Sequence, residues 1–100
     1  SMPVALIRAE RVKRLLQSEA VRTRGELLDI IKACGMRVNR STLRSWIHRG
    51  QLPQQGEDSY SNPLYRFSDC YRLTTGLSEN ADVWEIMQAA QNQSKEGDNQ

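Results

Sequence analysis

Apolar residues recur at helical spacing near the start of the chain. Ala5, Ala9, Val12, Leu16 and Ala20 follow one another at steps of three and four. Such steps place side chains on one face of an α-helix, so the pattern predicts an amphipathic helix over residues 4–22. Because its apolar stripe is narrow, rich in alanine and free of aromatic residues, we expect this helix to pack on protein and not to insert into a membrane.

A second helix is predicted to begin at Thr23. Thr23 and Glu26 have the spacing of a capping box, in which each side chain accepts a hydrogen bond from the backbone of the other residue. Its buried side is expected to consist of Leu27, Leu28, Ile30 and Ile31. Gly35 stands where a left-handed residue ends a helix, so a short turn is expected to follow.

A third helix is predicted from about Asn39 to Gly50, with Asn39 as a favourable N-cap residue. Leu43, Trp46 and Ile47 fall on one side of this helix and are expected to face the core. The opposite side is entirely polar and mostly cationic, and it carries Arg40, Ser41, Arg44, Ser45 and His48. The helix is therefore predicted to present a basic face to solvent.

Residues 51–67 have the pattern of a β-hairpin. Gly56, Asn62 and Pro63 interrupt a polar stretch that ends in the β-prone residues 64–67. The sequence therefore predicts two strands joined by a long tip.

A short helix is predicted after the hairpin. Ser68 and Asp69 are suitable capping residues, the helix is expected to run through Leu73, and Gly76 closes it.

The last helix is predicted over residues 78–90, with Ser78 or Asn80 as its cap and Asp82 in its first turn. Its apolar positions recur with helical spacing at Val83, Ile86, Met87 and Ala90. Residues 91–100 lack apolar side chains, so we expect this segment to be a disordered tail.

Composition adds limits to this picture. One hundred residues with 38% hydrophobic content support one small domain. Cys34 and Cys70 lack the spacing of a zinc or redox pair, so no metal and no cofactor are expected, and a reducing cytoplasmic location fits best. His48 has no nucleophile or paired carboxylate beside it in the sequence, and no glycine-rich phosphate loop occurs. We therefore do not expect an enzyme.

Charge is distributed unevenly along the chain. Residues 1–50 contain eleven Arg or Lys against four acids, which gives +7, whereas residues 51–100 contain three against eight, which gives −5. No acidic residue occurs between Asp29 and Glu57. A one-sided basic region of this kind is typical of proteins that bind a polyanion, although a solvated surface without a partner is an equally acceptable reading of charge alone.

The segment TRGELLDIIKACGMRVNRSTLRSWIHRGQLP resembles the N-terminal DNA-binding unit of MerR-type regulators and of phage excisionases. The resemblance rests on a T-x-x-E box, a "V-[polar]-R-S-T-L-R" entry to the third helix, an aromatic residue three positions later and a glycine before the hairpin. The matching residues are Thr23, Glu26, Val38, Arg40, Ser41, Thr42, Leu43, Arg44, Trp46, Gly50 and Leu52. The later Tyr65, Arg66, Phe67 and Asp69 are similar to the exit from the excisionase hairpin. The hairpin tip departs from many relatives, which are basic there, because it carries Glu57 and Asp58.

This resemblance implies a winged helix-turn-helix, a mainly α fold with a small β-hairpin wing and extra helices at both ends. The expected organisation is an N-terminal helix in 1–22, the winged unit in 23–76 with its recognition helix at about 39–50 and its wing at about 51–67, a C-terminal helix in 77–90 and a tail in 91–100. Such a unit reads double-stranded DNA by placing the third helix in the major groove.

The resemblance also implies roles for individual residues. Expected base-reading residues are Arg40, Ser41, Arg44, Ser45 and His48, and expected phosphate-binding residues are Arg24, Lys32, Arg37, Arg49 and Arg66. The protein would then act as a small transcriptional regulator or as an excisionase-like recombination factor, associated with the nucleoid. The alternative is a helical protein-interaction adaptor that uses the apolar C-terminal helix. That helix also makes self-association, as a dimer or side by side on DNA, an open expectation beside packing on the first helix.

Overall fold

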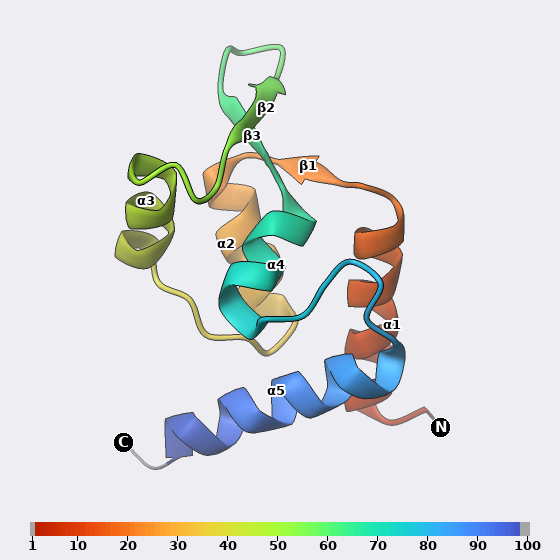
Figure 1. Ribbon diagram of the computed structural model, residues 1–100. Coiled ribbons are helices and arrows are strands. Elements are labelled where there is room, and N and C mark those ends of the chain that lie inside the picture. The colour runs from red at the N-terminus through yellow and green to blue at the C-terminus, as the bar shows by residue number, and fades with distance from the viewer. Residues whose placement is uncertain (1, 99–100) are drawn as a thin grey trace.

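The computed structural model describes residues 2–98, with side chains described for residues 2–93. Over these residues the chain forms five helices and a three-stranded antiparallel sheet (Figure 1). In chain order the elements are α1 (Val4–Gln17), β1 (Val21–Arg22), α2 (Arg24–Ala33), α3 (Arg40–His48), β2 (Gln54–Glu57), β3 (Pro63–Arg66), α4 (Phe67–Thr75) and α5 (Val83–Asp98). The molecule is thus a small α/β domain, consistent with the expectation of a mainly α chain with a hairpin.

Both ends of α2 are set by local sequence, as predicted. At its start, the backbone N–H of Glu26 donates to Thr23 Oγ1 at 3.3 Å and the N–H of Thr23 donates to Glu26 Oε1 at 3.2 Å. At its end, Gly35 is left-handed with φ of 80°, and the N–H of Met36 donates to the carbonyl of Ile31. This pair of features confirms the capping box and the glycine stop.

The helix α3 is delimited in the same way. Asn39 caps its start by accepting a hydrogen bond from the N–H of Thr42 at 2.8 Å. Gly50 has φ of 77° and ends it, while the N–H of Gln51 donates to the carbonyl of Trp46. The chain then turns directly into β2, so the position of the hairpin is tied to the end of α3.

The sheet contains a strand that the sequence did not predict. The predicted first helix ran to residue 22, but α1 ends at Gln17, Glu19 takes a positive φ of 55°, and β1 pairs with β3. Val21 lies opposite Arg66 in this antiparallel pair, and β3 also pairs with β2, which gives the order β1-β3-β2. A strand of two residues has no periodic signal of its own, because it exists only through its partner.

The start of α4 also differs from the prediction. Ser68 and Asp69 do not cap it; the helix begins at Phe67, Arg66 holds the N-cap position, and no side chain makes a cap hydrogen bond. Instead the N–H of Phe67 donates to the carbonyl of Ala20 at 2.9 Å, in the chain before β1. A tertiary contact therefore replaces the local cap. Gly76 ends α4 in the left-handed conformation, as predicted, but after Thr75 and not after Leu73.

The last helix is shifted relative to its predicted range. It starts at Val83 because Asp82 is its cap: Asp82 Oδ1 accepts from the N–H of Glu85 at 2.9 Å, and Glu85 Oε1 accepts from the N–H of Asp82. Neither Ser78 nor Asn80 has this role. The helix continues to Asp98, through residues where the sequence predicted a disordered tail. Residues 99 and 100 of that expected tail lie outside the described residues.

The core lies between α1, α2 and α4, and α5 closes it from below in Figure 1. Tyr71 and Phe67 of α4 are fully buried and stack with ring centroids 5.6 Å apart. Ile86 of α5 is also buried, so α5 belongs to the fold. It packs on α1, which was one of the two expectations for this helix, beside self-association. Within residues 2–98, no helix has the combination of length and apolar character that crossing a membrane would need.

Candidate nucleic-acid interface

The helix α3 stands at one edge of the molecule (Figure 1). Most polar side chains of this helix are exposed to solvent. Leu43 is completely buried and anchors the helix, while Trp46 and Ile47 are partly buried against the core. These three positions confirm the predicted inward face, although Trp46 is less enclosed than a central core residue.

The five expected base-reading residues share the outer side of α3, with different degrees of exposure. Arg40, Ser41, Arg44 and His48 are exposed, and Ser45 is half-buried. At about 100° per residue, Ser41, Ser45 and His48 lie opposite the buried stripe, and the two arginines lie along its flank. Their long side chains can reach round to the outermost line of the helix, which the shorter serines already occupy.

One of these residues is partly engaged in holding the helix together. The hydroxyl of Ser41 donates to Asn39 Oδ1 at 2.7 Å, and the hydroxyl of Thr42 donates to the same oxygen at 2.9 Å. While this bond is present, Ser41 can accept a hydrogen bond from a ligand but cannot donate one. Its first role is therefore in the N-terminal cap of α3.

The arginines of α3 carry charge that the protein does not neutralise. Among side chains of residues 2–93, the one ion pair is Arg72 with Asp69, at 3.6 Å on α4. Arg40, Arg44 and Arg49 consequently have no carboxylate partner within this described part. An exposed cationic face without internal partners attracts anionic ligands, since binding does not have to break an existing ion pair.

The hairpin beside α3 has an organised tip. Asp58 Oδ1 accepts from the N–H groups of Tyr60 and Asn62, at 2.9 and 2.8 Å, and Asp58 Oδ2 accepts from the side-chain amide of Asn62. These bonds, with the backbone N–H of Asn62 contributing most, lower the pKa of the Asp58 carboxyl. Asp58 is therefore a structural residue of the tip and the source of a fixed negative charge there.

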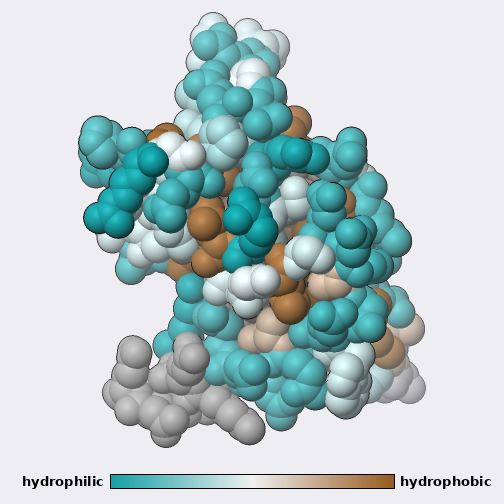
Figure 2. Space-filling model, in the orientation of Figure 1, coloured by the Kyte–Doolittle hydropathy of each residue, from teal (hydrophilic) through white to brown (hydrophobic). Residues whose placement is uncertain are grey.

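The fixed tip holds one aromatic side chain in solvent. Tyr60 is 84% exposed, the largest exposure among the bulky apolar and aromatic residues of the described part. Figure 2 shows the surface of the hairpin, at the top of the view, in teal and white, from hydrophilic to neutral. The sequence analysis did not single out Tyr60; the signal was an aromatic residue placed between Asp58 and Asn62 in an otherwise polar turn.

The expected phosphate-binding residues fall into separate places around α3. Arg24 is exposed in the first turn of α2, beside a hollow that it forms with Asn62 and Tyr65 of the hairpin. Lys32 lies eight residues further along α2, about 12 Å away along the helix axis, near the turn that carries Arg37. The structure therefore places Arg24 at the hairpin end of α2, and Lys32 and Arg37 at the end that leads into α3.

The remaining two residues of this set differ from each other. Arg49 is exposed as the C-cap residue of α3, next to the hairpin. Arg66 is half-buried at the end of β3, where it pairs with Val21 across the sheet. Arg66 and Ser45 are thus half-buried, whereas the other eight expected site residues are exposed.

Reactive thiols and metal-binding clusters are two further kinds of site that the described part of the chain could contain. Both cysteines are buried, and burial raises the pKa of the Cys70 thiol to about 11 and also raises that of Cys34, so both stay as protonated thiols near neutral pH. Among the side chains that the structure describes, no three His, Cys, Asp or Glu residues gather into a possible metal site.

Comparisons of the chain with protein-family models, with curated proteins and with solved structures found no match. The interface is therefore argued from the residues and geometry of this chain alone.

Proposed function

We propose that this protein binds double-stranded DNA through a winged helix-turn-helix, with α3 as the reading helix and the β2–β3 hairpin as the wing. The observation that carries the proposal is the exposed face of α3, where Arg40 and Arg44 have no carboxylate partner among the described side chains. A helix of this diameter fits the major groove of B-DNA, and its free arginines match acceptor atoms there.

The arrangement of the neighbouring elements supports the same proposal. The chain runs from α2 through a turn into α3 and then directly into the hairpin, which is the order of elements in a winged helix-turn-helix. The resemblance of residues 23–75 to MerR-type regulators and phage excisionases has the same order of elements. Because no relative matches, the proposal is supported by the order of the elements and by the arginines of α3 that have no carboxylate partner among the described side chains.

Within the proposal, Arg40 and Arg44 read bases, because a guanidinium can bond to both major-groove acceptors of guanine. Ser45 and His48 contact bases or phosphate beside them, and Ser41 contributes mainly through the cap. Arg24, Lys32, Arg37, Arg49 and Arg66 contact phosphate and fix the register of the protein on the duplex. Tyr60 at the wing tip is added to this set, as a side chain that meets the sugar-phosphate backbone.

The protein needs no cofactor and catalyses no reaction in this proposal. Its biological role is that of a small transcriptional regulator or an excisionase-like recombination factor, in the cytoplasm and associated with the nucleoid. An integrase gene next to its own would favour the recombination role, and a divergent promoter would favour the regulatory role.

A salt titration tests the proposal. Each phosphate neutralised contributes roughly −0.9 to the slope of log affinity against log salt, so four to six contacts predict a slope of about −4 to −5. Arg49→Ala should reduce the magnitude of this slope by about 1. Arg14→Ala removes the same charge from an exposed position on α1 and serves as the control, with an unchanged slope.

Two results would contradict the proposal. Affinity that does not change with salt would mean that phosphate contacts are absent. Equal slopes for Arg49→Ala and Arg14→Ala would mean that attraction comes from net charge and not from the surface around α3.

One observation favours the alternative of a protein-interaction adaptor. Trp84 on α5 is 66% exposed, which is unusual for a tryptophan with apolar neighbours. This side chain is also the candidate contact for self-association. Substituting it leaves the proposed DNA surface intact, so Trp84→Ala separates the two functions in one binding assay.

A further inference from the structure

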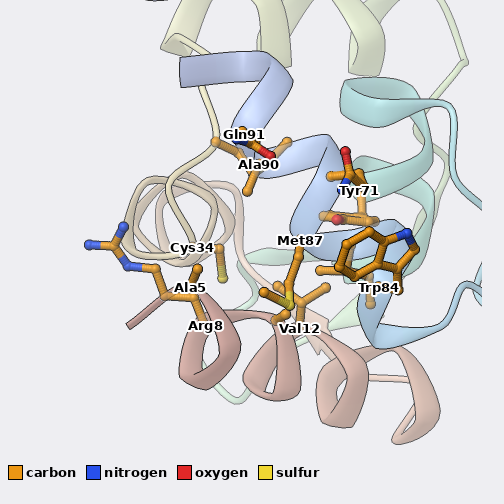
Figure 3. A pocket seen from close by; sticks show the side chains of 13 residues that line it. Ala5, Arg8, Val12, Cys34, Tyr71, Trp84, Met87, Ala90 and Gln91 are labelled. Carbon is orange, nitrogen blue, oxygen red and sulfur yellow. The ribbon is translucent and has the colours of Figure 1, made fainter. Parts of the chain in front are cut away.

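An apolar pocket of about 400 Å³ lies between α1 and α5. Its walls come from α1, α4, α5 and the turn between α2 and α3, and Figure 3 shows Val12, Cys34, Tyr71 and Met87 around the same space. Pockets of roughly 300–1,000 Å³ that are mostly apolar with a few polar groups are typical small-molecule sites. None of the ten expected DNA-contacting residues lines it.

The pocket contains a buried polar group without a partner. Tyr71 is fully buried, and its hydroxyl makes no hydrogen bond to any described residue. Leaving such a group unsatisfied is unfavourable, because the phenol has lost its hydrogen bond to water and gained none in return. A ligand atom that accepts this hydrogen bond would remove the penalty.

The buried hydroxyl is available as a donor at physiological pH. Burial, with a smaller contribution from nearby Cys34, raises the pKa of Tyr71 to about 12, so the phenol keeps its proton. The Cys34 thiol is also neutral, because burial raises its pKa. Tyr71 and Cys34 thus carry no charge, while the exposed Arg8 adds a positive charge and Gln91 a neutral amide among the lining residues.

We propose that this pocket binds a small, uncharged, mostly apolar molecule that carries a hydrogen-bond acceptor, such as a carbonyl oxygen, for the hydroxyl of Tyr71. The hydroxyl itself has almost no surface open to the pocket. The acceptor therefore reaches it when a lining side chain moves, and Met87, an unbranched thioether among the lining residues, changes conformation at low cost. The exposed ring of Trp84 forms part of the wall at the opening.

The test uses acetophenone and α-methylstyrene, two flat probes of the same shape that differ in having a carbonyl oxygen or a methylene group. Methionine methyl groups labelled with ¹³C report binding to the full chain by NMR. Met36 and Met87 line the pocket and should shift with acetophenone, whereas the exposed Met2 should not. Tyr71→Phe should weaken acetophenone binding roughly three- to tenfold, the usual range for one hydrogen bond, and leave α-methylstyrene binding unchanged.

A second variant tests whether both probes bind inside the pocket. Ala90→Phe fills the pocket from α5 and should abolish the methyl shifts for both probes while the protein stays folded. The proposal is overturned if neither Met36 nor Met87 responds to acetophenone at saturating concentration. It is also overturned if Tyr71→Phe changes the affinity for both probes by the same factor, or if Ala90→Phe leaves the shifts in place.

Discussion

At the scale of single residues, the proposed interface depends on which arginines point into the groove and which lie along its edge. Arg44 lies in the middle of α3 and is exposed on its outer flank, whereas Arg49 is the C-cap residue beside the hairpin. A side chain in the middle of the helix can reach a base edge. One at the helix end lies closer to the phosphate backbone.

These positions predict different effects for two substitutions of the same charge. Arg44→Ala should cost on the order of 1 to 3 kcal/mol on a preferred duplex, selected from a random pool, and should relax the preference at one base pair. Arg49→Ala should weaken preferred and scrambled duplexes alike. The measurement is the affinity of each variant for both duplexes at one salt concentration. An equal loss on both duplexes for Arg44→Ala would show that Arg44 contacts phosphate. A different side of α3 would then face the bases.

The hairpin tip has a pH dependence that follows from Asp58. Hydrogen bonds from Asn62 and Tyr60 lower the pKa of the Asp58 carboxyl below its ordinary value of 3.8. The ionised carboxylate therefore orders the tip fully above pH 3.8, and this ordering is lost as the pH falls through the lowered pKa. The amide resonances of Tyr60 and Asn62 should therefore move together on acidification. Asp58→Asn should remove this transition, whereas Glu57→Gln, next to it, should leave it. Amide shifts that persist in Asp58→Asn would show that another group controls the tip.

At the scale of elements, the sequence predicted most of the parts whose signals are local, although the capping box of Asp82 and Glu85 was missed. The capping box at Thr23, the cap at Asn39 and the left-handed glycines at 35, 50 and 76 each act within a few residues, and all were recognisable in the sequence. The strand β1 and the start of α4 depend on distant partners and were missed. β1 exists through β3, and α4 starts at Phe67 because of the carbonyl of Ala20.

The site followed the same division. Periodicity identified the outer face of α3, since burial of Leu43 fixes how the helix is turned. The exposure of Tyr60 depends on the folded tip, and the hollow beside Arg24 depends on where the hairpin packs against α2. Neither is encoded in the spacing of residues along the chain.

The last helix provides a matched pair of substitutions. Ile86 is 2% exposed, and Ile86→Ala should reduce the free energy of unfolding by about 2 to 5 kcal/mol. Trp84→Ala, two residues earlier, should change stability by only about 0.5 kcal/mol, because this side chain is mostly in solvent. Thermal unfolding measures both effects, and sedimentation shows whether Trp84→Ala alone weakens self-association. Similar losses of stability for the two variants would contradict the orientation of α5.

At the scale of the whole molecule, charge and size agree with a compact DNA-binding unit. The net charge of +2 conceals a basic first half, which contains α3, and an acidic second half, which contains α5. An uneven charge of this kind orients the molecule as it approaches a polyanion. Its longest dimension is 41 Å, against about 34 Å for one turn of B-DNA, so in the proposed complex one copy would cover at most about one turn.

The central claim is that α3 and the hairpin, and not α5, form the surface that meets DNA. Backbone amide NMR of the full chain, titrated with a duplex longer than one turn at low salt, tests this directly. We expect the largest shifts in Arg40–His48, at the hairpin tip around Tyr60 and at the start of α2 near Arg24, with α5 unchanged. Shifts concentrated on α5 around Trp84, or no shifts at all, would contradict the account.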